Sequence, residues 1–176
     1  MLPEVGTWQL DAAHSTVRFV AKHISLSRVY GQFNQFEGAI TIADPVARSS
    51  VEVVINAASI DTNHDQRDAH LRSADFLAVD RYPHLYFTGS QFTHIRGDKW
   101  ALKGSLSIHG VTGPVLMDTT YHGLQEWNGT RVGFSATTTL HRQDFTLNYN
   151  QMASRGIAVV GSTVEVHLDV QAVLER

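Results

Sequence analysis

The chain has 176 residues, a length that fits one domain with its own hydrophobic core, so we expect a single domain over residues 1–176. It contains no cysteine, which excludes disulfide bridges and thiolate metal sites. Its 14 lysine and arginine residues against 17 acidic residues give a net charge of −3 and form no basic block, so nucleic acid is not an expected partner.

The N-terminal sequence MLPEVGTWQLDAAHS has no basic stretch followed by an apolar run, and therefore does not resemble a signal peptide. No apolar run approaches the roughly 20 residues that a membrane-spanning helix needs. These features predict a cytoplasmic protein without stable membrane insertion. A leader removed before Met1 would instead place the protein in the periplasm or outside the cell.

Most of the chain alternates between apolar and polar residues with a period of two, the pattern of half-buried β-strands. About eight or nine such segments follow one another, and no βα alternation points to a parallel sheet. The apolar members are, in chain order, Val17, Phe19 and Ala21; Phe36, Ile40 and Ile42; Val51, Val53 and Ile55; Leu85 and Phe87; Trp100, Leu102, Leu106 and Ile108; Val115, Met117 and Tyr121; Val132, Phe134, Ala136 and Leu140; and Val164, Val166, Leu168, Val170 and Ala172.

Turn signals between these segments favour antiparallel hairpins. Arg96-Gly97-Asp98 and Asn128-Gly129 each join two runs, and Gly110–Pro114 marks a break or bulge between two others. Long antiparallel strands with one apolar face stack as a sandwich or close into a barrel, and closure removes the unpaired edges. A barrel of eight strands leaves room for side chains or for one small ligand.

The stretch Ser59–Phe87 interrupts the alternation and is crowded with charge, histidine and aromatic residues. A long excursion of this kind in a β domain is usually functional or covers something. Thr62-Asn63-His64-Asp65 has the pattern of a capping box with Thr62 as N-cap and Asp65 at N3, which predicts a short helix through about Arg72. Asp68 and Arg72 are spaced for an i,i+4 ion pair.

The apolar stripe of this predicted helix is thin, consisting essentially of Ala69 and Leu71. Such a stripe suits a helix that lies over an opening better than one inside a core. A second short turn is expected over Ser73–Leu77, with Phe76 and Leu77 pointing inward. The segment Ser59–Leu77 is therefore predicted to cover or flank the mouth of a barrel.

Motifs spread over nearly the whole chain resemble the YceI-like family of bacterial lipocalin-like proteins. In order they are Trp8-x-x-Asp11-x-x-His14-Ser15, Lys22-His23, Gly31-x-Phe33, Ser59-Ile60-x-Thr62, Arg67-Asp68-x-His70-Leu71, Asp75-Phe76, Tyr82-Pro83-x-Leu85-x-Phe87, Gly104-x-Leu106-x-Ile108-His109-Gly110-Val111-Thr112 and Arg142-x-Asp144-Phe145.

The resemblance implies an all-β, lipocalin-like, eight-stranded antiparallel barrel, often a homodimer, with one or two short helices inserted near residues 63–78. It also implies a ligand with a long apolar part, such as a polyisoprenoid, a quinone-like lipid or a fatty-acyl derivative. The chain departs from the family in two respects. Thr146 stands where the family usually has glycine after the Arg142-x-Asp144-Phe145 motif, and many members are secreted, whereas no leader is expected for this chain.

The expected function is non-catalytic binding, carriage or sequestration of an isoprenoid or fatty-acyl lipid inside the barrel. An apolar interior suits such a ligand because each buried CH₂ contributes about 0.8 kcal/mol. An interior filled by its own side chains, with a structural or regulatory role, is the alternative. The residues predicted to line the interior are Phe19, Phe36, Ile40, Val53, Ile55, Phe76, Phe87, Leu106, Ile108, Met117, Phe134 and Leu140.

Polar residues near the expected mouth are candidates for contacting a lipid head group, namely Asn63, Arg67, His70 and Arg142. We expect no metal site, because His64 and Asp68 supply only two of the three or four ligands that one needs. His14, His23 and His109 fall near strand ends and suit a barrel rim.

An enzyme that uses rim histidines on a small amphiphile is the competing interpretation. Asp11, His14 and Ser15 invite comparison with a catalytic triad, but no G-x-S-x-G elbow accompanies them, and a triad is defined by geometry. Asp11 more simply closes a turn and Ser15 begins a strand. No P-loop, dinucleotide-binding or paired-carboxylate motif is present, so no cofactor is expected.

Overall fold

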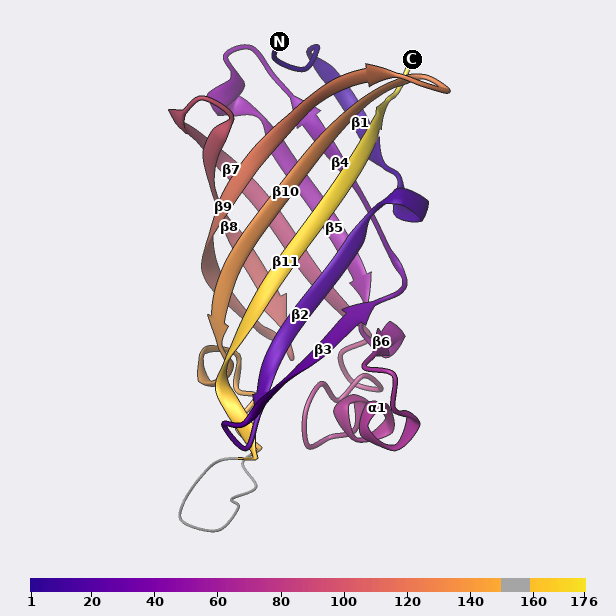
Figure 1. Ribbon diagram of the computed structural model, residues 1–176, viewed down its shortest axis with the longest axis vertical. Coiled ribbons are helices and arrows are strands. Elements are labelled where there is room, and N and C mark those ends of the chain that lie inside the picture. Colours follow the sequence, from indigo (N-terminus) through magenta and orange to yellow (C-terminus); the bar gives the residue numbers. More distant parts are fainter. Residues whose placement is uncertain (150–158) are drawn as a thin grey trace.

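Antiparallel β-strands make up most of the computed structural model, which describes residues 1–149 and 159–176 (Figure 1). The strands are β1 (Gly6–Leu10), β2 (Thr16–His23), β3 (Ser27–Phe33), β4 (Phe36–Ile42), β5 (Ser50–Asn56), β6 (Ile60–Asp61), β7 (His84–Arg96), β8 (Lys99–Ile108), β9 (Val111–Glu126), β10 (Thr130–His141) and β11 (Val160–Leu174). One α-helix, α1 (Asp65–Arg72), and four 3₁₀ turns, η1 (Ala12–His14), η2 (Val46–Arg48), η3 (Ala57–Ser59) and η4 (Arg142–Phe145), complete the described elements.

The strands close into a barrel of eight, as the family resemblance implies, and not into a sandwich. Two of the eight are long strands with a break: η1 separates β1 from β2, and Asn34-Gln35 separates β3 from β4. β1 pairs with β4 on one side and with β11 on the other, while β2 pairs with β3 and β11 lower down. Because β1 and β11 meet, most of the sheet has no free edge.

Tight turns join the long strands, and residues that tolerate a left-handed backbone occupy them. Asn128 and Gly129 have φ values of 48° and 104° between β9 and β10, which confirms that predicted hairpin. The predicted break at Gly110–Pro114 is a hairpin at His109-Gly110, with φ values of 55° and 73°, rather than a bulge. Pro114 itself lies within β9 opposite Ser105.

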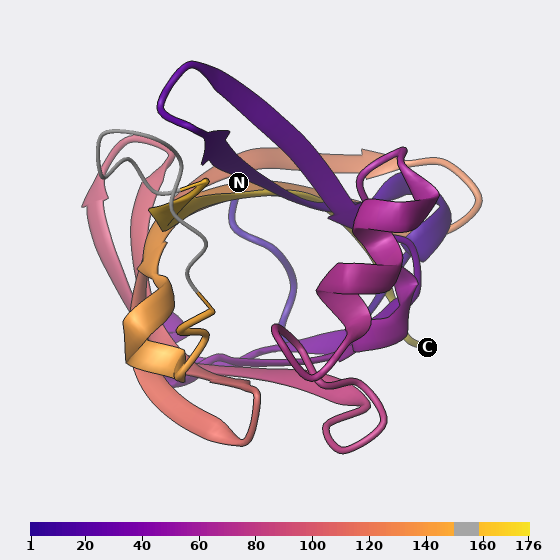
Figure 2. The ribbon, with the colours of Figure 1, turned by 90° about the horizontal axis from the view of Figure 1, so that it is seen from below.

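The two ends of the barrel differ (Figures 1 and 2). Both termini and the β7–β8 and β9–β10 turns lie at one end, called the upper end here. There Trp8, Val132 and Ala172 are almost fully buried, where β1, β10 and β11 come together. Helix α1, η4 and the β2–β3 hairpin surround the other, lower end, so the excursion at Ser59–Leu77 flanks the barrel mouth as predicted.

Helix α1 begins differently from the prediction. Its N-cap is His64, whose Nδ1 accepts a hydrogen bond from the backbone N–H of Arg67 at 3.1 Å, so the predicted capping box with Thr62 as N-cap is wrong. The predicted ion pair of Asp68 with Arg72 does not form either. The Asp68 carboxylate instead accepts hydrogen bonds from the backbone N–H and the hydroxyl of Thr62. A histidine can cap because its unprotonated ring nitrogen is an acceptor.

The segment after α1 is a turn, as predicted, and it buries Phe76 and Leu77. Of the one or two short helices expected near residues 63–78, one is present. No helix in the described part of the chain is long and apolar enough to span a membrane.

Candidate ligand-binding cavity

The barrel interior is hollow and holds two cavities. The upper one encloses about 930 Å³ of empty space and the lower one about 1380 Å³, including the part open to solvent. The alternative of an interior filled by its own side chains therefore does not describe this barrel.

The two cavities meet at a ring of residues midway along the barrel. Six residues line both cavities, and we call them the waist: Leu10, Val53, Phe87, Met117, Leu168 and Val170. They come from strands on all sides of the barrel, because the inward positions of neighbouring strands stand level with one another. The two cavities therefore adjoin at an apolar wall midway between the upper and the lower end.

All twelve residues predicted to line the interior do so, although whether they contact a ligand stays a prediction. Ile40 and Phe134 line the upper cavity; Val53, Phe87 and Met117 line both; and Phe19, Phe36, Ile55, Phe76, Leu106, Ile108 and Leu140 line the lower one. Eleven of them lie on strands, and their inward direction follows from the period of two. Phe76 arrives from the turn after α1.

Several lining residues were not among the predicted set. Leu168 and Val170 have the inward parity of β11 and Trp100 that of β8, so alternation already indicated their direction. Leu2 and Pro3 also line the upper cavity, from the segment before β1. Nothing in their local pattern indicated this, because the position of a terminal segment depends on contacts far away in sequence.

The upper cavity has no charged residue among its described lining residues. Its polar side chains are largely occupied: the Ser49 hydroxyl accepts from the Ala43 N–H at 2.9 Å, and the Ser135 hydroxyl lies 2.8 Å from Nε2 of His122. The Tyr121 hydroxyl is buried and has no hydrogen-bond partner among the described residues. Burial raises the pKa of Tyr121, so the phenol stays neutral.

Arg142 is the one predicted head-group residue that lines a cavity, the lower one. It is buried, and its guanidinium donates to four backbone carbonyls, those of Leu147, Tyr149, Val160 and Gly161, at 2.8–3.3 Å. Desolvation lowers the pKa of Arg142 from its usual range. Its first role is thus structural: it holds η4 against the start of β11.

The other three head-group candidates lie outside the cavity lining. Asn63 is exposed, with φ 62°, and Arg67 donates from Nε and Nη2 to the side chain and carbonyl of Thr62, both at 2.7 Å. Nε2 of His70 lies 2.8 Å from the Asp75 carboxylate. The side chains of Arg67 and His70 fix the fold of the α1 segment beside the mouth.

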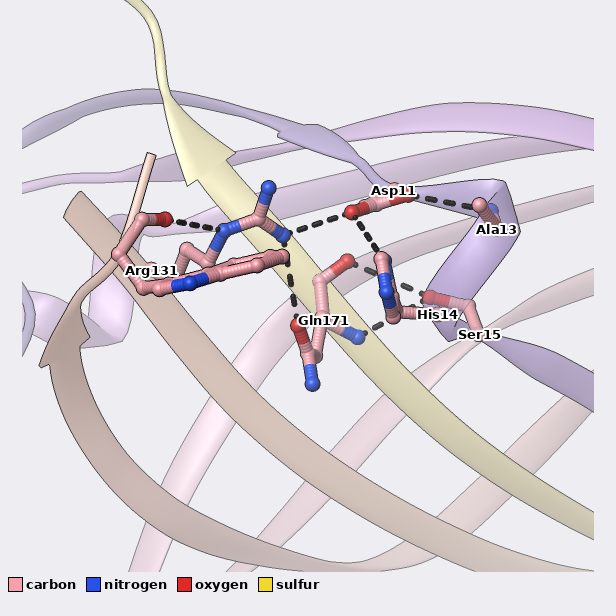
Figure 3. Close-up of polar contacts among 7 residues, drawn as sticks. Asp11, Ala13, His14, Ser15, Arg131 and Gln171 are labelled. Carbon is pink, nitrogen blue, oxygen red and sulfur yellow. Dashed lines mark hydrogen bonds and ion pairs between the residues drawn. The ribbon is translucent and has the colours of Figure 1, made fainter. Parts of the chain in front are cut away.

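Asp11, His14 and Ser15 do not form a catalytic triad (Figure 3). Nδ1 of His14 lies 2.8 Å from Asp11, but the Ser15 hydroxyl accepts from the backbone N–H of Gln171 and donates to its carbonyl, at 3.0 and 3.3 Å. Arg131 completes the cluster through Asp11. The arrangement ties η1 to β10 and β11, and Asp11 caps the η1 turn as the sequence suggested.

Histidines elsewhere are also engaged in local structure. His64 caps α1, and Nδ1 of His109 lies 2.9 Å from the Thr146 hydroxyl. Within residues 1–149 and 159–176, no group of three or more potential ligands converges in a way that could hold a metal ion.

The geometry defines a hollow, lipocalin-like barrel with an apolar lumen. The chain matches the YceI-like domain over residues 8–172, and it belongs to that family. UPF0312 proteins of Vibrio cholerae and Yersinia pestis are 34% and 35% identical to it over 167 and 166 residues. These alignments cover 92% and 93% of this chain, and 82% and 83% of the two relatives.

Solved structures share the fold. BcnA of Burkholderia cenocepacia has a TM-score of 0.79 at 22% identity, covering 92% of this chain and 98% of that one. A polyisoprenoid-binding domain from Saccharophagus degradans has a TM-score of 0.74 at 18% identity, covering 98% and 100%. The YceI protein of Campylobacter jejuni has a TM-score of 0.67 at 26% identity, covering 84% and 88%.

Proposed function

We propose that the protein binds the apolar chain of an isoprenoid-like or fatty-acyl lipid along the barrel axis, as a carrier or sequestering protein without chemical turnover. The observation that carries this proposal is the waist, where six apolar residues line both cavities, so that the two cavities adjoin midway along the barrel. Membership of the YceI-like family and the structural likeness to a polyisoprenoid-binding domain support it.

The energetics favour a long chain over a small polar molecule. Each buried CH₂ contributes about 0.8 kcal/mol, so a long tail binds without any hydrogen bond, less the cost of ordering it. A polar ligand would lose its hydration in the upper cavity, where most polar side chains already have partners. Selection in such a lumen therefore acts on the length and width of the chain.

The head group is proposed to lie at the lower end. Two charged residues line the lower cavity, Arg18 and Arg142, and Nη2 of Arg18 is engaged outside the barrel by Asp169 at 3.0 Å. Arg142 thus remains the charged group best placed to face a polar head. Asn63 and His70, beside the mouth, would meet the head group only after it leaves the lumen.

Native extraction is the first test. The protein is purified without detergent, extracted with organic solvent, and the extract is searched for a lipid by mass spectrometry. We expect a prenyl or long acyl compound in the extract, and binding of both probe classes by the emptied protein. An empty preparation that binds neither prenyl alcohols nor fatty acids would refute the proposal.

A matched pair of variants tests whether the ligand passes the waist. Val53 and Val54 are neighbours on β5, but Val53 faces the waist and Val54 does not line either cavity. Val53→Phe should weaken binding of long prenyl chains much more than that of short ones, while Val54→Phe should change neither. Equal effects of the two variants would mean that the chain does not run through the lumen.

Assembly and location complete the proposal. We propose a homodimer, on the strength of the family resemblance, and sedimentation equilibrium would test it by giving twice the chain mass. We propose a cytoplasmic location, which fractionation of cells that express the native gene would test.

A further inference from the structure

The β2–β3 hairpin projects from the lower rim of the barrel (Figure 2). Its tip, defined as residues Lys22–Arg28, ends in an exposed Leu26 with a relative exposure of 82%. Ile24 and Ser25 adopt left-handed backbone conformations, with φ values of 44° and 60°. A β-branched residue in this region is a conformational outlier, which indicates that the tip is held in a shape costly for its sequence.

The tip also concentrates positive charge. Lys22 and Arg28 are opposite each other in the β2–β3 register, both are exposed, and neither forms an ion pair with a described residue. The sequence has no acidic residue between Asp11 and Glu37, and residues 150–158 contain none either. Like charges directly opposite each other destabilise a hairpin, so the tip carries an electrostatic cost that an anionic partner would offset.

We propose that this tip docks the protein onto the surface of an anionic lipid bilayer. Leu26 would enter the interface between head groups and acyl chains, and Lys22 and Arg28 would meet lipid phosphates, the combination of apolar and basic residues that surface-bound segments use. A protein partner fits less well, because a seven-residue tip falls far short of the roughly 20–30 residues that a stable interface uses on each side.

Docking through the tip would orient the lumen toward the membrane. Ala21, next to Lys22 and facing inward, lines the lower cavity together with Phe19. The protein as a whole has a net charge of −3, so attraction to an anionic bilayer must come from local groups of cations such as the tip. An apolar chain could then pass between the bilayer and the lower cavity with little exposure to water.

The inference implies weak, salt-sensitive binding. Two cations and one leucine give a transient contact, suited to a carrier that arrives and leaves. Charge attraction of exposed groups fades when the screening length shrinks from about 30 Å at 0.01 M salt to about 8 Å at 0.15 M.

The absence of cysteine permits a direct test with single labels. Leu26→Cys and Ile95→Cys are each labelled with an environment-sensitive fluorophore. Ile95 is also exposed, at 60%, but lies at the upper end near the β7–β8 turn. With phosphatidylcholine vesicles containing phosphatidylglycerol, we expect a blue shift at position 26 and none at position 95. Vesicles of phosphatidylcholine alone should give a much smaller shift, and added salt should reverse it.

The second part of the experiment removes the positive charges of the tip. Lys22→Gln/Arg28→Gln should lower the vesicle partition coefficient roughly 10- to 30-fold. Arg96→Gln/Lys99→Gln removes another cross-strand pair of cations, at the upper end, and should leave partitioning unchanged. All four side chains are exposed, so the fold should persist in both variants.

The outcomes separate docking from lipid binding. No shift at position 26, or equal shifts at both positions, would overturn the inference. A shift without vesicles that grows with protein concentration would overturn it in favour of self-association. A soluble prenyl probe is titrated against the same variants: retained probe binding with lost docking is the expected result. Docking without probe binding would keep this inference and count against the proposed function.

Discussion

Nη1 of Arg131 lies 2.6 Å from Oδ2 of Asp11, a contact that bridges β10 and the η1 turn across β11 (Figure 3). The same carboxylate oxygen lies 2.8 Å from Nδ1 of His14. The Arg131 guanidinium stacks over the Trp127 ring at 5.0 Å and donates to the Trp127 carbonyl. We call this group of Asp11, His14, Trp127 and Arg131 the clasp. It lies where the first long strand breaks, beside the β1–β11 contact that closes the barrel.

The clasp should make the free energy of unfolding of the barrel depend on pH. Hydrogen bonds from Arg131, and then His14, lower the pKa of Asp11 from 3.8 to about 2. A carboxyl with a lowered folded-state pKa stabilises the fold above its unfolded pKa, and this contribution disappears as the pH falls through the folded value. Asp11→Asn should therefore cost about 1 to 2 kcal/mol in free energy of unfolding at neutral pH. The deficit should shrink between pH 3.8 and about 2.

Denaturant unfolding of the native protein and of Asp11→Asn across this pH range measures the difference between their free energies of unfolding. The contributions of the other carboxyl groups are the same in both proteins and cancel from this difference. Arg131→Gln serves as the control, because it should return the pKa of Asp11 toward its usual value, as NMR titration would detect. A deficit that is the same at every pH would show that the carboxylate charge does not act through this contact.

Thr146 occupies a left-handed position after η4, with φ 54° and ψ 25°. Such a backbone costs an L-residue about 1–2 kcal/mol and costs glycine little, which explains why glycine suits this position. The Thr146 hydroxyl is 2.9 Å from Nδ1 of His109, so a direct Thr146→Gly change mixes two effects. Neither Thr146→Gly nor Thr146→Ala has the hydroxyl. The difference in stability between these two variants therefore measures the effect of a Cβ atom at this left-handed position.

We expect the glycine variant to be more stable than the alanine variant by about 1 kcal/mol in chemical denaturation. A third variant, Thr146→Ser, keeps the hydroxyl and should fall closest to the native protein. Equal stability of the glycine and alanine variants would mean that this backbone position is unstrained.

The alternation of residues made the strands and the lining of the interior predictable, because a strand assigns its side chains to two faces by parity alone. Closure into a barrel of eight, rather than a sandwich, was expected only from the family resemblance. Val53 and Val54 illustrate this: one faces the lumen and its neighbour does not. The start of α1 was not predictable from a capping pattern. Thr62 and Asp68 form a hydrogen-bonded pair of their own, and His64 takes the capping position that is left.

The hydrogen-bond partners of the polar residues in the site could not be predicted from the sequence either. The sequence placed Arg142 near the mouth of the barrel. It did not show that the guanidinium N–H groups donate to backbone carbonyls, because these partners depend on how η4 packs on β11. The isolation of the Tyr121 hydroxyl is likewise a property of the assembled lumen, since its surroundings come from other strands.

Removing the Tyr121 hydroxyl should cost nothing and should improve the lumen for hydrocarbon. A buried hydroxyl without a partner carries a desolvation penalty of about 1–3 kcal/mol, part of which Tyr121→Phe relieves. We expect an unchanged or higher melting temperature, and tighter binding of a purely hydrocarbon probe. Tyr30→Phe, at a position 64% exposed, is the matched control and should change neither. A clear loss of stability in Tyr121→Phe would reveal an ordered water that satisfies the hydroxyl.

Arg142 should prove indispensable for the lower end of the barrel. Its planar guanidinium reaches four carbonyls at once, including those of Leu147 and Gly161 on either side of residues 150–158. A lysine keeps the charge but has a single nitrogen that cannot reproduce this fork, so Arg142→Lys leaves buried carbonyls without donors. We expect a loss of about 2–4 kcal/mol in free energy of unfolding, together with faster hydrogen exchange in η4 and the start of β11.

Arg18→Lys is the matched control for Arg142→Lys, because Arg18 also lines the lower cavity but has an exposed partner in Asp169. That control should change stability by less than about 1 kcal/mol. The affinity ratio between a fatty acid and the corresponding alcohol then separates the two roles of Arg142. A ratio that Arg142→Lys leaves unchanged would confine Arg142 to the structural role. A falling ratio would mean that its guanidinium also contacts the head group, because the fork that could face a carboxylate has been lost.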